Sequence, residues 1–179
     1  TKVILDCDDL ELGSNRFQTG WQKKIVGWFE KAVPRWARLV TSNTNYNLNH
    51  LKEQGVSAEK LIYIPNGNDP IRFRTPDDAA VEKLRGDLGL SGKKVVAFIG
   101  SLSLTNHPVD LLMRAFPRVH ATLPDARLVI VGTGEDLTEL KELARAMQIE
   151  QATQFIGRVA PDQVPLYYAI SDVTVDPVF

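Results

Sequence analysis

A strand, a glycine turn and a helix follow one another directly in residues 95–116, which read VVAFIGSLSLTNHPVDLLMRAF. The first five residues are all apolar, so the strand they predict is buried on both faces. Gly100 opens the turn, and a helix is expected from Pro108 to Thr122. The alternation continues, with strands expected at residues 127–131, 153–156 and 173–175 and helices at 136–147 and 161–170. This order predicts an α/β fold in which helices cover both faces of a parallel sheet.

A second α/β segment precedes this one. Strands are expected at residues 2–5, 38–42 and 61–64, and helices at 17–36 and 45–54, the second ended by Gly55 in a left-handed conformation. The densest turn signal, PNGNDP at residues 65–70, predicts a domain boundary between 1–68 and 69–179. Beyond it, Thr75 is expected to cap a helix that runs to about Leu88. No helix follows the last strand, so we expect a fragment in which both domains are incomplete.

Composition narrows the classes of function. The chain has 179 residues and a net charge of −1, which gives no electrostatic case for nucleic acid. No apolar run approaches the ~20 residues of a membrane-spanning helix. Cys7 is the only cysteine, so an internal disulfide is impossible and a reducing compartment such as the cytoplasm is expected. The acids around Cys7 disfavour its thiolate, so it is not expected to be a nucleophile.

The turn after residue 99 is the first candidate site. Gly100 lets the backbone approach a ligand, and the start of the next helix offers free N–H groups and the positive end of a dipole, which suits a phosphate. Asn106 or His107 can cap that helix. A tight strand-to-helix loop that binds nothing has the same local sequence, so both interpretations stay open here.

Two further motifs are weaker. Gly132 and Gly134 begin like a dinucleotide fingerprint, but the third glycine is absent, so a nicotinamide cofactor is not expected. Asp6 and Asp8, with Asp9 beside them, could chelate Mg²⁺ or Mn²⁺ through carboxylate oxygens. No third ligand is identifiable, so the preferred interpretation is an acidic loop that caps a helix or lines a cleft.

The segment from Phe17 to Trp36 is predicted to be an amphipathic helix, kinked or restarted at Pro34. Its aromatic and apolar stripe is flanked by four cations, Lys23, Lys24, Lys31 and Arg38. This layout is found in helices that lie on anionic membranes. We prefer the alternative that the three tryptophans pack into the core of the first domain.

Phrases along nearly the whole chain resemble the large retaining glycosyltransferase family 4, whose members have two Rossmann-like domains (the GT-B fold). The interdomain phrase is IPNGND at residues 64–69, with Phe73 after it. The others are VAFIGSL at 96–102, HPVDLL at 107–112, ARLVIVGTG at 126–134, FIGRV at 155–159 and VPLYYAISDV at 164–173. Their order and spacing identify the chain as an internal fragment of such an enzyme.

The resemblance implies that residues 1–68 are the latter part of an acceptor-side domain and 69–179 the first part of a nucleotide-sugar domain. Gly100, Ser101, Leu102 and His107 would then face the donor diphosphate, and Gly132, Gly157, Arg158 and Val159 would lie near the nucleotide. Asp8 and Asp9 would line the acceptor-side cleft. The family transfers a sugar to a glycan, lipid-linked or small-molecule acceptor with retention of configuration. No metal or cofactor is expected, and the implied location is cytoplasmic, with peripheral membrane contact through Phe17–Trp36 as a possibility.

Two departures from the family matter. Many members carry arginine and lysine where this chain has Ser101 and His107, and a protonated His107 could partly replace the lysine. The family's acidic E-x7-E segment is expected beyond Phe179, so we expect the fragment alone to be inactive. Two alternatives stay open: a degenerate, non-catalytic domain that binds a nucleotide or a partner, and a sugar-nucleotide epimerase on the same fold.

Overall fold

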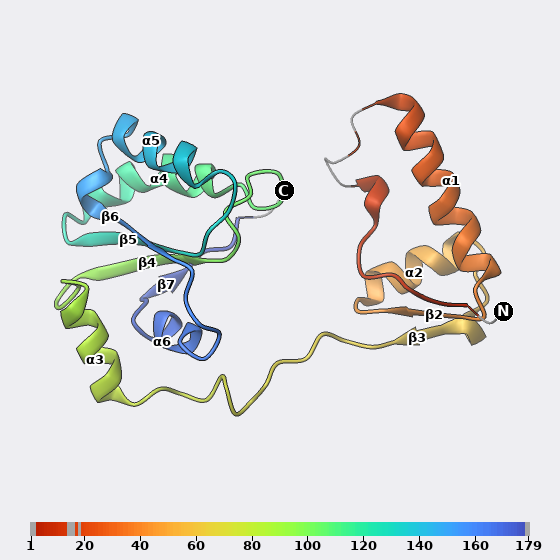
Figure 1. Ribbon diagram of the computed structural model, residues 1–179, viewed down its shortest axis with the longest axis horizontal. Coiled ribbons are helices and arrows are strands. Elements are labelled where there is room, and N and C mark those ends of the chain that lie inside the picture. Colours follow the sequence, from red (N-terminus) through yellow and green to blue (C-terminus); the bar gives the residue numbers. More distant parts are fainter. Residues whose placement is uncertain (1–2, 14–16, 18, 178–179) are drawn as a thin grey trace. The chain divides into compact units, whose positions relative to one another are not determined.

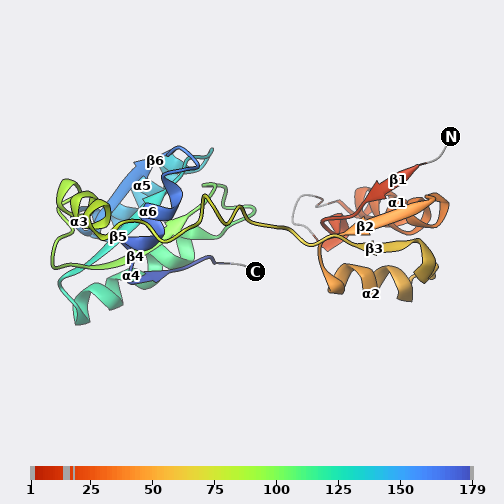
Figure 2. The ribbon, with the colours of Figure 1, turned by 90° about the horizontal axis from the view of Figure 1, so that it is seen from below.

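The computed structural model describes residues 3–13, 17 and 19–177. It divides into two compact units, Thr1–Asn68 and Asp69–Phe179, and each is described by itself (Figure 1). Residues 64–77 join them without a helix or strand (Figure 2). The turn lies at residues 70–73, later than the predicted 65–70, and Asp69 holds it through its carboxylate Oδ1, which accepts the amides of Ile71 and Arg72 at 2.9 and 3.2 Å.

The first unit is a parallel three-stranded sheet in the order β1-β2-β3. Its elements are β1 Ile4–Asp6, a 3₁₀ turn at Glu11–Gly13, α1 Gly20–Trp36, β2 Leu39–Ser42, α2 Asn45–Glu53, a 3₁₀ turn at Ala58–Lys60 and β3 Leu61–Tyr63. Thr44 caps α2 by accepting the Asn47 amide, and Gly55 after α2 has the expected positive φ of 83°. Lys2, in the first predicted strand, lies outside the described residues.

The preferred interpretation of the tryptophans is wrong. In α1, Trp21 is 64% exposed, Trp28 55% and Trp36 70%, and the small core is formed without them by Ala37, Val40, Leu51 and Val56. The helix runs through Pro34 to Trp36 without the predicted restart, and Pro34 is its only buried residue. Helical periodicity therefore located the apolar stripe of α1 correctly, but not what the stripe packs against.

The second unit alternates helices and strands as predicted. Its elements are α3 Asp78–Asp87, β4 Lys94–Ile99, α4 Val109–Thr122, β5 Ala126–Val131, α5 Leu137–Ala146, a 3₁₀ turn at Glu150–Ala152, β6 Thr153–Gly157, α6 Val164–Ala169 and β7 Val173–Thr174. All strands are parallel, in the order β6-β5-β4-β7. Val96 of β4 lies between Leu128 of β5 and Val173 of β7.

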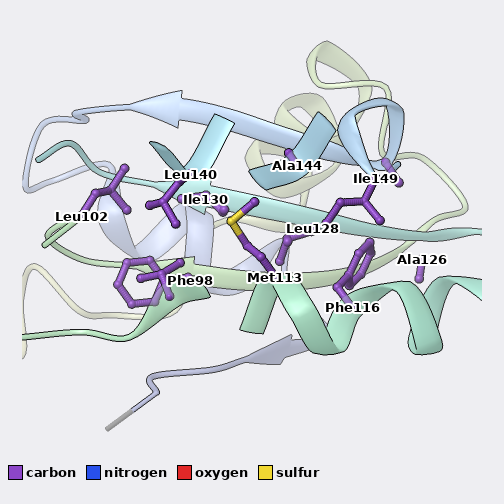
Figure 3. Close-up of a cluster of buried hydrophobic side chains, with 12 residues drawn as sticks. Phe98, Leu102, Met113, Phe116, Ala126, Leu128, Ile130, Leu140, Ala144 and Ile149 are labelled. Atoms are coloured by element: carbon purple, nitrogen blue, oxygen red, sulfur yellow. The ribbon is translucent and has the colours of Figure 1, made fainter. Parts of the chain in front are cut away.

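Helices cover both faces of this sheet, as the apolar strands predicted (Figure 1). On one face, Phe98 and Leu128 pack with Met113 and Phe116 of α4 and with Leu140 of α5 (Figure 3). On the other face, side chains from α3 and α6 pack against alternate residues of the strands, among them Val95, Ala97, Val129 and Val131. The alternation of buried side chains between two covered faces explains why the strands show no polar–apolar periodicity.

Two predicted caps are wrong. Asp77 and not Thr75 caps α3, because its carboxylate Oδ1 accepts the Ala79 amide at 3.3 Å. Helix α4 begins after Pro108 without a side-chain cap, so neither Asn106 nor His107 caps it.

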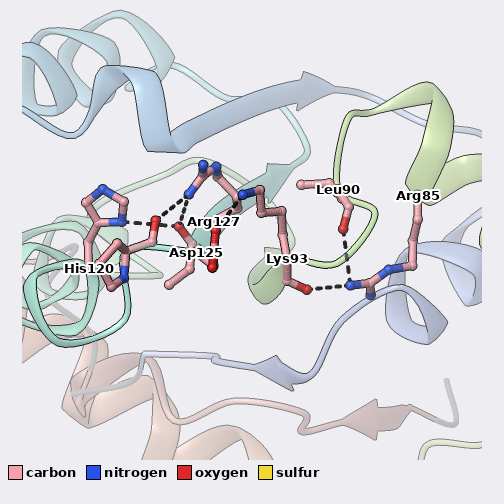
Figure 4. A network of polar contacts seen from close by, with 8 residues as sticks. Arg85, Leu90, Lys93, His120, Asp125 and Arg127 are labelled. Carbon is pink, nitrogen blue, oxygen red and sulfur yellow. Dashed lines mark hydrogen bonds and ion pairs between the residues drawn. The ribbon is translucent and has the colours of Figure 1, made fainter.

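The amino ends of the strands in the second unit are tied by a polar network (Figure 4). Arg85 of α3 donates to the carbonyl oxygens of Leu90 and Lys93, at 3.3 and 2.5 Å, and also to that of Ile170. Lys93 pairs with Asp125 at 2.5 Å. The edge where the strands begin is therefore occupied by structural contacts, which leaves the opposite edge, where the strands end, as the place for a ligand.

Candidate functional site

Three of the predicted site glycines follow one another along the carboxyl edge of the second unit's sheet. Gly100 follows β4, Gly132 follows β5, and Gly157 ends β6. The Gly100 amide donates to the Val131 carbonyl at 2.9 Å, and the Gly132 amide donates to the Gly157 carbonyl at 2.8 Å. The structure thus brings the three turns into one hydrogen-bonded row at the edge where open α/β sheets bind their ligands.

The pair Gly132 and Gly134 has a packing explanation. A Cβ built on Gly132 would lie 1.8 Å from the carbonyl oxygen of Gly100, and one on Gly134 would lie 2.1 Å from that of Leu102. Gly132 also has a φ of +135°, which side-chain-bearing residues rarely adopt. The glycines therefore let two neighbouring loops touch backbone to backbone.

The contact between these loops extends beyond the glycines. The Leu102 amide donates to the Thr133 carbonyl at 3.1 Å, and the Leu102 carbonyl accepts the Asp136 amide at 3.2 Å. Asp136 in turn accepts the Leu104 amide through its carboxylate at 2.7 Å. The Ser103 hydroxyl donates to Glu135 at 2.8 Å and lowers the pKa of that carboxyl. We call residues 100–108 and 132–136 the paired loops.

These bonds change what each predicted diphosphate residue can offer. Leu102 is fully buried with its side chain in the core (Figure 3), and both of its backbone polar groups are already bonded. The Gly100 amide is bonded to Val131. Ser101 is exposed, and its amide makes no hydrogen bond within the part of the chain that the structure describes. Of residues 100–102, Ser101 therefore presents the free backbone donor.

His107 lies at the end of the first paired loop, directly before α4. Its Nδ1 is 3.4 Å from the carboxylate Oδ1 of Asp176, and its ring contacts that of Phe98 at a centroid distance of 6.1 Å. Asp176 follows β7, and nothing in the sequence pattern linked it to His107. The missed signal is topological: β7 lies beside β4, so the segments that follow both strands meet at the same edge.

The turn at the end of β6 contains three predicted site residues in different environments: Gly157, Arg158 and Val159. Gly157 has a φ of +83° with open space around its Cα, so a turn conformation explains the glycine. Arg158 is exposed and forms no ion pair with any residue placed in the structure. Val159 is half-buried and packs against the core on the α3–α6 face. Arg158 is thus a cation available to a ligand at the carboxyl edge.

The acidic loop of the first unit is held by hydrogen bonds. The Thr41 hydroxyl donates to the Asp6 carboxylate, and the Asn47 side chain donates to the Asp8 carbonyl at 2.8 Å. Within residues 3–13, 17 and 19–177, no three His, Cys, Asp or Glu side chains are grouped so that they could hold a metal ion. Burial first, then the charges of Asp6, Glu30 and Asp8, raise the pKa of Cys7, so its thiolate is disfavoured as predicted.

A cavity of about 220 Å³ beside this loop was not predicted from the sequence. It lies within the first unit, and its lining is mostly apolar, with contributions from the β1 end and from helices α1 and α2. Asp9, Glu30 and His50 are the titratable side chains besides Cys7 that line it. Of the two acids expected at an acceptor-side cleft, Asp9 therefore faces a cavity, and Asp8 does not line it.

Comparisons with known proteins identify the family of the chain. A family model described as "Glycosyl transferases group 1" matches residues 80–178. A GDP-mannose-dependent α-(1-6)-phosphatidylinositol monomannoside mannosyltransferase of Mycobacterium tuberculosis is 31% identical over 90% of the chain and 43% of its own length. The mannosylfructose-phosphate synthase of Agrobacterium fabrum is 32% identical over 82% of the chain and 34% of its own length.

Among solved structures, Anabaena HepE in complex with UDP-glucose is similar, with a TM-score of 0.78 and 22% identity over 99% of the chain and 47% of its own. The chain thus spans less than half the length of the relatives and structures it matches here. No helix in the described part of the chain is long and apolar enough to cross a membrane.

Proposed function

Because the chain belongs to the glycosyl transferases group 1 family, we propose that the whole protein is a hexosyltransferase that uses a nucleoside-diphosphate sugar. The observation that carries the proposal is the row of turns after β4, β5 and β6, which lies within the matched residues 80–178. The acceptor is a glycan, a lipid-linked sugar or a small molecule, and the sugar keeps its anomeric configuration.

In the proposed donor site, negative charge is met by groups that the carboxyl edge leaves free. The Ser101 amide, an unbonded backbone donor, faces the diphosphate. Helix α4 contributes the positive end of its dipole, since its Val109 and Leu111 amides are already bonded to the His107 and Pro108 carbonyls. His107 supplies a further donor there, and Gly100 and Leu102 shape the turn. These groups supply the charge stabilisation without a metal or cofactor.

The nucleotide is proposed to lie toward β6. Arg158 is the exposed cation on that side, and Val159 and Gly157 form the surface from which it projects. Gly132 keeps the neighbouring loop close to the sheet, so that it does not block the nucleotide. Arginine suits this place because its planar guanidinium can stack on a base or bind a phosphate in a bidentate manner.

For the first unit, we propose an acceptor-side role. Asp9 and the cavity beside it are the polar and apolar parts of a surface that an acceptor with an apolar portion could use. A lipid-linked acceptor is supported by the mycobacterial relative, a phosphatidylinositol monomannoside mannosyltransferase. The exposed apolar side chains of α1, which covers residues 20–36 of the predicted segment Phe17–Trp36, support peripheral contact with the inner face of a membrane.

The proposal is tested with the full-length protein. Purified enzyme is incubated with UDP-glucose, GDP-mannose or ADP-glucose and a lipid or sugar acceptor, and release of the free nucleotide is followed. The substitution Arg158→Ala should lower kcat/KM about tenfold, because a charged contact to the nucleotide-sugar donor is lost. Arg118→Ala, an exposed arginine on α4, is the matched control and should leave kcat/KM unchanged.

The alternatives give different results in the same assay. A non-catalytic binding domain binds a nucleotide but releases none from any donor. An epimerase converts one nucleotide sugar into another with the nucleotide still attached. Either result would contradict the transferase proposal, and the substitution of Ser101 and His107 for the cations usual in the family is the observation that favours the first of them.

A further inference from the structure

The His107–Asp176 contact joins two segments that are far apart in the sequence and belong to different strand ends. The Nδ1 atom of His107 is shielded from solvent and forms no hydrogen bond of good geometry with any residue that the structure describes. The nearest acceptor is the Asp176 carboxylate, 3.4 Å away. A shielded ring nitrogen that faces a carboxylate is stable when it carries a proton, because its lone pair would otherwise face a negative charge.

The rest of His107 is held in place. Its amide donates to the Ser103 carbonyl at 2.8 Å, and its carbonyl accepts the Val109 amide at 2.7 Å. The ring edge lies against Phe98 of the core. The side chain is 34% exposed although Nδ1 is not, so its accessible surface belongs to the other ring atoms. The imidazole thus has one edge toward Asp176 and another edge open.

Other ionisable groups near this loop already have partners. On α4, Asp110 pairs with Arg114 at 3.3 Å. On the second paired loop, Glu135 accepts from the Ser103 hydroxyl and Asp136 accepts from the Leu104 amide. Asp176 is therefore the charged group within the described chain that pairs with the His107 ring.

We propose that Asp176 is a positioning residue for the donor: it accepts the Nδ1–H of His107 and orients the ring, whose Nε2 is protonated as the diphosphate binds and donates to a diphosphate oxygen. When His107 is neutral before binding, one proton comes from the buffer and goes to the ring as the diphosphate binds. The inference rests on the proposed function, because it requires a nucleoside diphosphate at this edge. It assigns to His107, held by Asp176, the hydrogen bond to the diphosphate that a lysine would otherwise donate.

The change in nucleotide affinity on removal of Asp176 distinguishes this inference from direct electrostatic repulsion between Asp176 and the diphosphate. Removing a carboxylate near a diphosphate should strengthen binding if the charge acts directly, because two negative groups repel. If Asp176 acts through His107, its removal weakens binding instead. The experiment measures the Kd of UDP and GDP by calorimetry with the full-length protein and its Asp176→Asn, His107→Ala and double variants.

We expect Asp176→Asn and His107→Ala each to weaken binding about tenfold, the size of a lost charge-assisted hydrogen bond. In the His107→Ala background, Asp176→Asn should bring no further loss. Titrations near neutral pH in buffers of different ionisation enthalpy should show proton uptake on binding for the wild type and none for His107→Ala. Asp87→Asn, which removes an exposed carboxylate of α3, is the control and should leave the proton uptake unchanged.

Tighter binding by Asp176→Asn, or an equal loss in the His107→Ala background, would overturn the inference and leave the transferase proposal standing. No nucleotide binding by the wild type would remove the proposed function itself. Should Asp176→Asn fold poorly, histidine ¹⁵N spectra of the wild type and Asp176→Glu decide without ligand. If neutral His107 carries its proton on Nδ1 in both proteins, the spectra support the hydrogen bond to the carboxylate at position 176. If the proton is on Nε2, the spectra contradict that hydrogen bond.

Discussion

The carbonyl oxygen of Gly100 occupies the space that a side chain on Gly132 would need, since a Cβ there would lie 1.8 Å away. This carbonyl oxygen belongs to the backbone of the neighbouring loop and cannot move aside as a flexible side chain could. The conformation of Gly132, with φ at +135°, adds a second cost to any substitution.

Gly132→Ala should therefore destabilise the protein by about 3 kcal/mol or more, from the clash and the strained backbone together. Urea unfolding monitored by circular dichroism measures this loss. Gly89 provides a matched control, because it also has a positive φ, 65°, but has nothing within 4 Å of an added Cβ. Gly89→Ala should cost only about 1 kcal/mol, and equal losses at the two sites would show that the loop contact is unimportant.

Arg85 should be one of the more sensitive charged residues of the second unit. It donates to the backbone carbonyls of Leu90 and Lys93 (Figure 4) and to that of Ile170, and Leu90 and Ile170 are buried. Arg85→Ala removes the donor to the buried Ile170 carbonyl and to the Lys93 carbonyl, while the Leu90 carbonyl keeps the Lys93 amide at 3.0 Å. The substitution should cost about 2 kcal/mol in chemical denaturation. Lys83→Ala removes only the exposed pair with Asp87 and should change stability by less than about 0.5 kcal/mol. A loss at Lys83 as large as at Arg85 would contradict this ranking.

Acid should destabilise the second unit through Asp172. The Val95 amide, and next the Lys94 ammonium, hold the pKa of this carboxyl below its ordinary value. A carboxyl with a lowered pKa in the folded state stabilises the fold above the unfolded-state pKa, near 3.9, and this contribution is lost as pH falls through the folded-state value. The thermal midpoint should accordingly fall between pH 5 and pH 3. Asp172→Asn should flatten that fall, and an unchanged pH profile would rule out this contribution.

The exposed stripe of α1 predicts a separation of stability from membrane binding. Trp21→Ala should change the free energy of unfolding by less than about 0.5 kcal/mol, because the side chain is 64% exposed, whereas Val40→Ala in the core should cost about 2 kcal/mol. Reversing Lys23, Lys24 and Lys31 to Glu should abolish sedimentation of the full-length protein with anionic vesicles. Sedimentation that survives the reversal would indicate that the stripe packs against protein instead.

The positions of helices and strands followed from the sequence because each is set by local patterns. Apolar runs fixed the cores of β4 and β5, and Gly55 and Gly89 marked helix ends through their positive φ values. The cap of α3 was missed because a second candidate, Asp77, lies two residues after Thr75, and only the geometry of the turn chooses between them.

Contacts between distant segments could not be read from the pattern. Helical periodicity shows that the tryptophans of α1 share one face of the helix. It does not show whether another element packs against that face, so their exposure was not predicted. The Leu102 amide looked free in the sequence because its acceptor, Thr133, comes from another loop. The approach of Asp176 to His107 likewise depends on β7 pairing with β4, which only the sheet order reveals.

The paired loops also set the size of the smallest part that could be exchanged between relatives. Because Gly132 and Gly134 lie directly against the backbone of residues 100–102, neither loop has room to accept a new length or path while the other keeps its own. In a chimera that receives only one loop from a relative, that loop does not fit against the other loop of the host. A chimera that receives both loops keeps their complementary contact. Engineering of donor preference at this edge therefore starts from the two loops together.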